Sequence, residues 1–335
     1  MTYALRRILL TIPLLLAVSL VVFALADALP GDPAAARFPK HPHLAEEWRE
    51  GRGLNDPFLV RWANYVTGIV TAFDFDESYL DDDPVGPELA IKLQATFELT
   101  ICALFLAILV GTTVGILSAI FPRSPVDYVG NVIALAGISI PVFWLAFMII
   151  SLAVNVFGFA WSSNRFDPSL SVEGFTTHLY LFESLLRFRF DVFVSCARNL
   201  LLPTLALSTI PMAVITRMTR SAMLEELGRD YATTARAKGL RQRSVVLKHV
   251  LRNALIPITT ITGLQFGQLM GGAVLTETVF SWPGLGRFIV KMGVGNRDTP
   301  IIVGGILLVA TTFIIVNLLV DLLYVVIDPR MRAAT

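Results

Sequence analysis

The sequence predicts an all-α polytopic membrane protein, and three observations lead to this class. Hydrophobic residues make up 55% of the 335 residues and charged residues only 16%, whereas a soluble domain has about 25% charged residues. Apolar runs of about 20 residues, long enough to cross the hydrocarbon of a bilayer, recur along the chain. The apolar–polar alternation of a membrane barrel is missing. Because lipid offers no hydrogen bonds to the backbone, each apolar run is predicted to be a helix.

Six membrane spans are predicted, at 8–29, 97–121, 129–157, 199–221, 256–280 and 300–326. The first follows Arg6 and Arg7, so a cleavable signal peptide is an alternative for it. Its 22 residues would extend about 33 Å, while the apolar part of a signal peptide has only about 7–15 residues. A retained membrane helix is therefore favoured. Pro141 in the third span, and Pro203 and Pro211 in the fourth, predict kinks.

Orientation follows from the distribution of Lys and Arg. Basic residues precede the first span, occur at Arg123, follow the last span at Arg330 and Arg332, and crowd the segment between spans four and five. An even number of spans places all four regions on one side of the membrane. That side is predicted to be the cytoplasm, so both termini are expected there. The exterior loop at 30–96 is too long to lack structure, and a local helix is expected around 58–73.

The segment between spans four and five is a charged island in an apolar chain. Asp230 is placed to cap a short helix running to Lys238, and Gly239 follows where a left-handed residue is favoured. Ala232, Ala235 and Gly239 leave one face of this helix nearly bare, so a partner surface could approach closely. A basic loop that contacts anionic lipid would have the same composition. The residue pattern alone leaves both interpretations open.

A family resemblance separates them. The stretch Tyr231-Ala-Thr-Thr-Ala-Arg-Ala-Lys-Gly-Leu240 resembles the cytoplasmic coupling loop, or EAA loop, of ABC-importer permeases in the variant of dipeptide and oligopeptide systems. Thr233 and Thr234 stand where the general motif has Glu and Ala. Further matches are Leu29-Pro-Gly-Asp-Pro33, Arg252-Asn-Ala-Leu-Ile-Pro257, Glu277-Thr-Val-Phe-Ser-Trp-Pro-Gly-Leu-Gly-Arg287, Asn317-Leu-Leu-Val-Asp-Leu-Leu-Tyr324 and Asp328-Pro-Arg330.

The resemblance implies a type I ABC importer permease fold with six transmembrane helices and both termini cytoplasmic, in the bacterial inner (cytoplasmic) membrane. It divides the chain into an N-terminal transmembrane helix at 1–29, an exterior loop region at 30–96, and a permease core at 97–335. The core would hold five transmembrane helices and the coupling loop at 222–255. The residues implied to contact an ATPase subunit are Tyr231, Ala232, Thr233, Thr234, Ala235, Arg236, Ala237, Lys238, Gly239 and Leu240.

The partners implied by the resemblance are a second homologous permease, two cytoplasmic ATPase subunits, an exterior solute-binding protein and membrane lipid. The sequence lacks a G-x-x-x-x-G-K-[ST] phosphate loop, so ATP and Mg²⁺ are expected to bind to the partner subunits. No cofactor, catalytic residue, metal site or nucleic-acid partner is expected in this chain. The histidines His41 and His43 are interpreted as a solvated pair, because a metal site needs three or four convergent ligands.

The expected cargo is a di- or oligopeptide, with nickel or glutathione as alternatives within the same family. An ATP-independent secondary transporter would have paired intramembrane acids or repeats with broken helices, and the sequence shows neither. Polar residues within spans should face protein or water, so Gln265, Gln268 and Glu277 are candidates for the translocation path. Gly263, Gly267 and Gly271 could pack either within the subunit or against a second permease.

Overall fold

The computed structural model describes the backbone of residues 2–158 and 163–327 and the side chains of residues 9–158 and 163–320. Arg330 and Arg332, on which the predicted orientation partly depends, lie outside the described residues. Within them the one β-pairing is an isolated bridge between Glu77 and Pro84. In chain order the helices are α1 (Thr2–Asp27), α2 (Pro33–Arg37), α3 (Pro42–Gly51), α4 (Phe58–Ala72), α5 (Val85–Ile120), α6 (Pro125–Ser139), α7 (Val142–Asn155), α8 (Tyr180–Leu186), α9 (Phe190–Leu227), α10 (Asp230–Ala237), α11 (Gln242–Ser244), the π-helix η1 (Val245–Val250), α12 (Leu251–Val279), α13 (Leu285–Phe288), the π-helix η2 (Ile289–Val294) and α14 (Thr299–Ile327).

Four helices of the described chain are long and apolar enough to cross a membrane, namely α1, α5, α9 and α14. Helix α12 occupies the position of the expected fifth span and is continuous over 29 residues. It is not one of these four helices, because Gln265, Gln268 and several threonines lower its mean hydropathy. The count of six spans and the cytoplasmic placement of both termini therefore stay predictions.

The third span is not one kinked helix, as the sequence predicts, but two helices. Helices α6 and α7 together have the length and composition of a span, and they are bent by 109°. Pro141 is the cause, because proline lacks an N–H and disfavours the helical conformation in the residue before it. Ile140 accordingly is extended, with φ −85° and ψ 125°. In contrast, α9 continues through Pro203 and Pro211 as one helix.

Glycines let α5 and α9 approach closely within the subunit. A Cβ added at Gly111 would lie 2.9 Å from the carbonyl oxygen of Met212, and one at Gly115 would lie 2.6 Å from Cβ of Thr219. Both distances are shorter than van der Waals contact, so neither glycine can be replaced without separating the helices. This is small-xxx-small packing of two membrane helices.

The glycines of α12 have two different surroundings. A Cβ at Gly263 would clash with Val320, and one at Gly267 with Phe313, both on α14. These two glycines therefore pack within the subunit. Gly271 has no neighbouring atom within 4 Å of an added Cβ, so this part of α12 faces open space.

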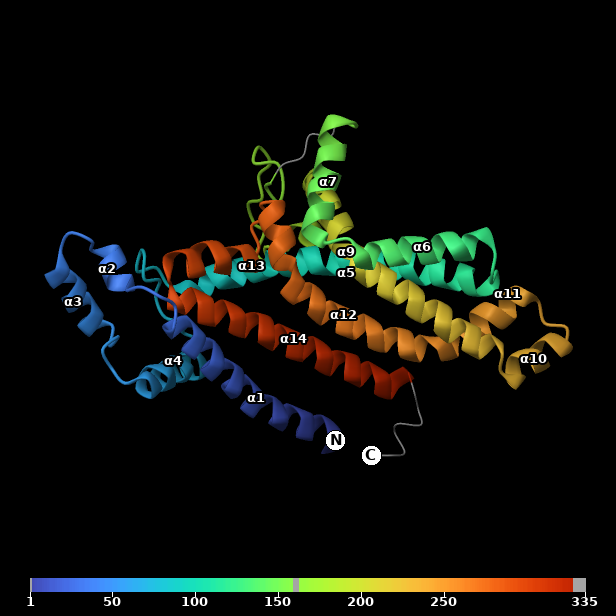
Figure 1. Ribbon diagram of the computed structural model, residues 1–335, viewed down its shortest axis with the longest axis horizontal. Helices are drawn as coiled ribbons and strands as arrows, with labels where there is room; N and C mark the ends of the chain where they lie inside the picture. The colour runs from blue at the N-terminus through green and yellow to red at the C-terminus, as the bar shows by residue number, and fades with distance from the viewer. Residues whose placement is uncertain (1, 159–162, 328–335) are drawn as a thin grey trace.

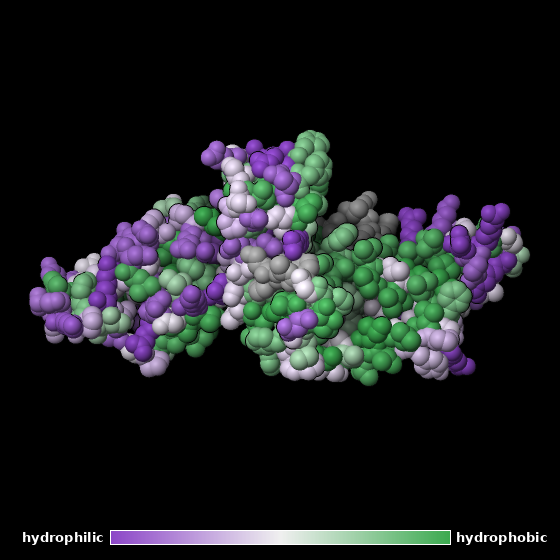
Figure 2. All heavy atoms as spheres, turned by 90° about the horizontal axis from the view of Figure 1, so that it is seen from above, coloured by the Kyte–Doolittle hydropathy of each residue, from purple (hydrophilic) through white to green (hydrophobic). Residues whose placement is uncertain are grey.

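The molecule is elongated, with its polar segments at opposite ends. Helices α2 and α3 lie at one end of the long axis and α10 and α11 at the other, while α7 projects from the side of the bundle (Figure 1). Hydrophilic side chains gather over both ends, with hydrophobic side chains between them (Figure 2). The local helix expected around 58–73 is confirmed as α4, Phe58–Ala72.

Candidate coupling site and translocation groove

Helix α10 contains most of the predicted coupling residues, and its C-terminus ends as predicted. Gly239 has φ +78°, its N–H donates to the carbonyl oxygen of Arg236 at 2.9 Å, and the N–H of Leu240 donates to Ala235 at 3.3 Å. This pair of bonds is the Schellman motif, which favours glycine at the left-handed position. The prediction for the N-terminus was wrong. Arg229 precedes the helix without a side-chain cap, and Asp230 is the first helical residue.

The small-residue face of α10 packs against its own chain and not against a partner, contrary to the expectation from sequence. Ala232 is fully buried, and Ala235 is 8% exposed. Both belong to a hydrophobic cluster with Val245, Val246 and Val250 of η1. Two alanines three residues apart let α10 lie directly on the π-helix. The bare face is thus a seat for the helix within the subunit.

The same cluster joins α10 to three long helices. It contains Ala119 at the end of α5, Met223 near the end of α9, and Ala254 and Ile258 at the start of α12. Close-packed interiors transmit displacement because they are poorly compressible. A force on α10 would therefore reach the ends of α5, α9 and α12 together.

The opposite face of α10 is open and basic. The exposed predicted coupling residues are Thr233, Thr234, Arg236, Ala237, Lys238, Gly239 and Leu240. Arg241, Arg243 and Lys248 are exposed beside them, and no ion pair to Arg236 or Lys238 occurs in the described part of the chain. This surface can bind an acidic or polar partner without first breaking internal ion pairs.

Tyr231 fixes the angle between α9 and α10. Its hydroxyl donates to Oε2 of Glu226 at 2.6 Å, and Arg229 pairs with Oε1 of the same carboxylate at 2.9 Å. Burial and the hydrogen bond to Glu226 raise the pKa of Tyr231, so the hydroxyl keeps its proton for this bond at neutral pH. Tyr231 thus stabilises the junction between α9 and α10, and its side chain is partly buried.

Of the predicted path residues, Gln268 is exposed, whereas Gln265 is 4% exposed. Nε2 of Gln265 donates to Oε1 of Gln268 at 2.7 Å, so the buried amide orients the exposed one. Leu264 is 51% exposed and lies four residues before Gln268, on the same face of α12. An open face of α12 therefore presents the Gln268 amide beside the apolar side chain of Leu264.

Glu277 has a different position from the one predicted. It is fully buried, and its carboxylate accepts hydrogen bonds from Thr96 Oγ1 at 2.5 Å and from the Arg287 N–H at 2.9 Å. A Cβ at Gly284 would lie 2.1 Å from Oε1 of Glu277, so the Pro-Gly-Leu-Gly turn closes over the carboxylate. This placement argues against a role in the path and favours one in joining α12 to α5.

A buried ion pair near the start of α5 was missed from sequence. Nη2 of Arg165 lies 2.6 Å from Oε2 of Glu98, and the two side chains are 7% and 1% exposed. Leu181 N–H donates to the other carboxylate oxygen at 2.6 Å, and Arg165 stacks on Tyr180 at 4.4 Å. The pair holds the segment before α9 against α5. The sequence did contain one sign of this pair: Glu98 is an acid at the start of a predicted span, where an ionised group needs a partner.

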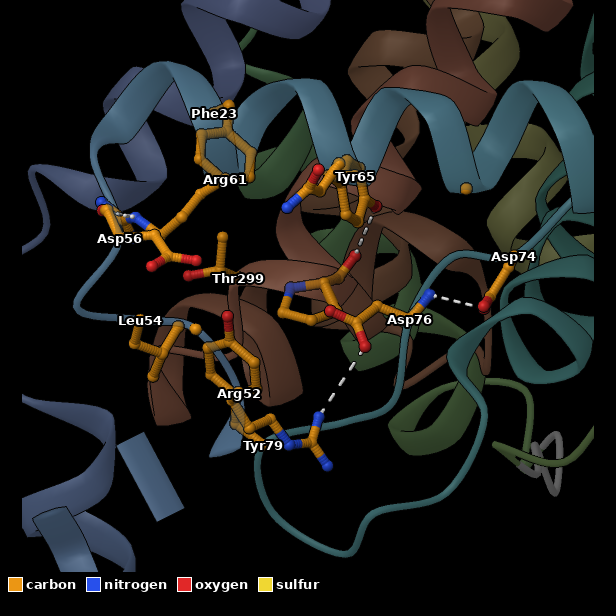
Figure 3. Close-up of a pocket in the computed structure, with 14 residues that line it drawn as sticks. Phe23, Arg52, Leu54, Asp56, Arg61, Tyr65, Asp74, Asp76, Tyr79 and Thr299 are labelled. Atoms are coloured by element: carbon orange, nitrogen blue, oxygen red, sulfur yellow. Dashed lines mark hydrogen bonds and ion pairs between the residues drawn. The ribbon is translucent and has the colours of Figure 1, made fainter. Parts of the chain in front are cut away.

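A pocket of about 200 Å³ lies between α1, α4 and the start of α14. Figure 3 shows Arg52 directed toward Asp76, at 3.8 Å, and the Tyr65 hydroxyl toward the Pro300 carbonyl, at 3.4 Å. Arg52 also pairs with Asp82 at 2.5 Å. Arg61, the other arginine that lines the pocket, pairs with Asp27 at 2.7 Å, so both lining arginines have acidic partners. The lining residues come from segments other than α12.

The site residues thus fall into three groups. The coupling residues lie on one short helix at the end of the bundle, Gln265 and Gln268 lie on the open face of α12, and Glu277 lies in the protein interior. Among the described residues, no group of three or more His, Cys, Asp or Glu could hold a metal ion. An apolar helical bundle with a basic helix packed at one end is the architecture of a multi-pass membrane protein.

Sequence comparison gives the family. The chain matches the family described as "Binding-protein-dependent transport system inner membrane component" over residues 111–333, and the N-terminal model of the same systems over residues 1–88. The chain belongs to this family. It is therefore a transport permease subunit, a multi-pass protein of the inner membrane, that works with a solute-binding protein and ATPase partners.

Three relatives illustrate the similarity. The dipeptide transport system permease protein DppB of Alkalihalophilus pseudofirmus is 44% identical, with 99% of both chains covered. The protein of the same name from Escherichia coli K12 is 40% identical, with 98% of both covered. The glutathione transport system permease protein GsiC of Pectobacterium atrosepticum is 37% identical, with 99% of both covered.

Proposed function

We propose that this chain is the permease subunit of an ATP-driven importer that takes up di- and oligopeptides delivered by an exterior solute-binding protein. The observation that carries the coupling mechanism is the position of α10. Its basic face is exposed, and its alanine face belongs to a core shared with α5, α9 and α12. The full-length similarity to dipeptide permeases supports the cargo.

In the proposed assembly the chain pairs with a second homologous permease. Two cytoplasmic ATPase subunits bind ATP and Mg²⁺, and a cleft of one of them receives residues Tyr231–Leu240. ATP-driven closure of the ATPases pushes α10, and the shared core carries the displacement to the ends of the three long helices. Six spans with both termini in the cytoplasm suit this arrangement, because they place α10 on the ATPase side.

Glutathione is the second candidate cargo, and the relative named for glutathione transport favours it. Glutathione is itself a tripeptide, so it presents the same amide and carboxylate groups as other short peptides. A path that binds these groups weakly would accept either molecule.

The test is uptake by the complete importer, reconstituted in proteoliposomes with its partner subunits and binding protein. Labelled dialanine, glutathione and Ni²⁺ are supplied separately, each with and without ATP inside. We expect ATP-dependent accumulation of dialanine. Accumulation of glutathione alone would support the second candidate, and accumulation of Ni²⁺ alone would exclude both. Uptake of dialanine without ATP would contradict the proposed coupling.

A further inference from the structure

A groove of about 410 Å³ lies between α9 and α12, lined by Val214, Arg217, Met218, Ser221 and Ile261. Ile261 precedes Leu264 by three residues and Gln268 by seven, so these three lie on one face of α12. The groove therefore continues the open face that presents Gln268. Apart from Arg217 and Ser221 its lining side chains are apolar.

Arg217 is the charged residue of this groove, and it is exposed. No acidic side chain of the described residues forms an ion pair with it, and none of them accepts a hydrogen bond from its guanidinium. Arg220, one turn further along α9, differs in this respect, because Asp127 binds it through two oxygens at 2.6 and 2.8 Å. Within the described residues, one of two neighbouring arginines is thus neutralised and the other has no acidic partner.

Arg217 lies within the predicted span at 199–221, four residues before its end, which corresponds to about 6 Å along the axis. An arginine within a membrane helix is costly against lipid and is found facing water or an anionic group. A long side chain can also reach the lipid interface, but Arg217 borders a cavity between two helices. Water in this groove would hydrate the guanidinium, and an anion entering the groove would meet it.

We propose that Arg217 binds the C-terminal carboxylate of the peptide as it passes along the groove between α9 and α12. The proposal rests on the proposed function, because it takes the cargo to be a peptide. A planar guanidinium can donate two parallel hydrogen bonds to a carboxylate. The apolar walls offer no competing polar group apart from Ser221. A single cation in an open groove holds its ligand only transiently, as a transport path requires.

The experiment compares the complete wild-type importer with Arg217→Gln, Arg217→Lys and Lys291→Gln in proteoliposomes. Lys291 is an exposed cation outside the groove, so Lys291→Gln controls for the loss of one positive charge. The probes are labelled dialanine and its C-terminal amide, which lacks the carboxylate. ATP hydrolysis stimulated by the binding protein, and co-purification of the second permease, are measured on the same samples.

We expect Arg217→Gln to lower dialanine uptake about tenfold or more relative to Lys291→Gln, the scale of one charge-assisted hydrogen bond. Arg217→Lys should restore much of the uptake, the amide should enter wild type and Arg217→Gln at equal rates, and assembly should not change. Equal dialanine uptake in Arg217→Gln and Lys291→Gln would overturn the proposal. So would an equal loss for dialanine and its amide. If the second permease no longer co-purified with Arg217→Gln, the proposal would also be overturned. Arg217 would then bind an acidic group of that subunit and not the peptide.

The wild type separates this inference from the proposed function. A wild-type importer that moves no dialanine would contradict the proposed peptide cargo. A wild type that moves dialanine, together with an Arg217→Gln variant that moves it equally well, would contradict the role of Arg217 alone.

Discussion

Arg220 of α9 binds Asp127 of α6 through two parallel hydrogen bonds, from Nε to Oδ1 at 2.6 Å and from Nη2 to Oδ2 at 2.8 Å. Asp127 is only 4% exposed and also accepts from the Arg123 N–H at 3.0 Å and from Asn131 at 2.8 Å. The pair joins the start of α6 to α9 one turn before the residues of α9 that support α10. Helix α6 is thus tied to the part of the molecule on which α10 acts.

Breaking this pair should destabilise the protein. Arg220→Met leaves the Asp127 carboxylate buried without its counter-ion, and we expect the free energy of unfolding to fall by about 3 kcal/mol. Thermal unfolding of the purified chain in detergent measures the loss. Arg189→Met is the control, because Arg189 and its partner Asp191 are 39% and 46% exposed, and exposed pairs contribute at most about 1 kcal/mol. Equal losses of unfolding free energy in the two variants would show that the buried Asp127 pair stabilises the protein no more than an exposed pair does.

Gly239→Val should uncouple ATP hydrolysis from uptake. Valine is strained at φ +78°, by about 1–2 kcal/mol, so the Schellman turn that ends α10 should rearrange and displace its exposed face. In the reconstituted importer we expect near-normal ATP hydrolysis with uptake lowered severalfold. Gly228→Val is the matched control, because Gly228 has φ −83°, and a Cβ there would lie 3.5 Å from its nearest neighbour. The prediction is wrong if both variants transport normally.

The two faces of α10 should respond differently to the same substitution. Ala232 is fully buried on η1, so Ala232→Leu overpacks the shared core and should cost about 1–3 kcal/mol of stability. Ala237 is exposed, so Ala237→Leu should leave the melting temperature unchanged and weaken co-purification of the ATPase. Melting curves and pull-down of the ATPase subunit read out the two effects. A loss of stability in Ala237→Leu but not in Ala232→Leu would reverse the assigned faces.

Local features were predictable from sequence. The left-handed conformation of Gly239 depends on one residue and its neighbours, so pattern alone was sufficient for it. At Pro141 the pattern located the distortion but predicted a kink in one helix, whereas the structure has two helices. The 109° angle at Pro141 was not predictable, because the packing of α7 against α9 and α12 sets it. The partner of the alanine face was missed for a similar reason. It is η1, a segment whose π-helical geometry has no signature in the sequence.

Long-range pairs were beyond the sequence analysis. Glu98 and Arg165 are separated by 67 residues, and neither shows its partner until the chain folds. Glu277 was predicted to line the path because acids are rare inside spans. Burial with several hydrogen-bond donors is the other solution to the same cost, and this chain uses it. One sequence cannot choose between the two.

Glu183 gives a prediction for the dependence of stability on pH. This residue of α8 is 5% exposed. Burial raises the pKa of its carboxyl, but hydrogen bonds from the Thr177 hydroxyl and the Thr176 and Thr177 N–H groups outweigh it, and the pKa falls to about 2. A carboxyl whose pKa is lower in the folded state stabilises that state when ionised. Its contribution is complete above the unfolded-state pKa of about 4.3 and is lost as the pH falls toward 2.

We therefore expect the segment at 163–189 to lose order in acid. Protection of its amides against hydrogen exchange, measured on the purified protein between pH 6 and pH 3, should fall by a free energy of about 1 kcal/mol for each pH unit below 4. Glu183→Gln should have low protection at pH 6 and little further change in acid. Glu173→Gln is the matched control, because Glu173 is exposed in the same segment, and it should behave as wild type. A wild-type segment equally protected at both ends of this range would show that the Glu183 bonds do not hold it.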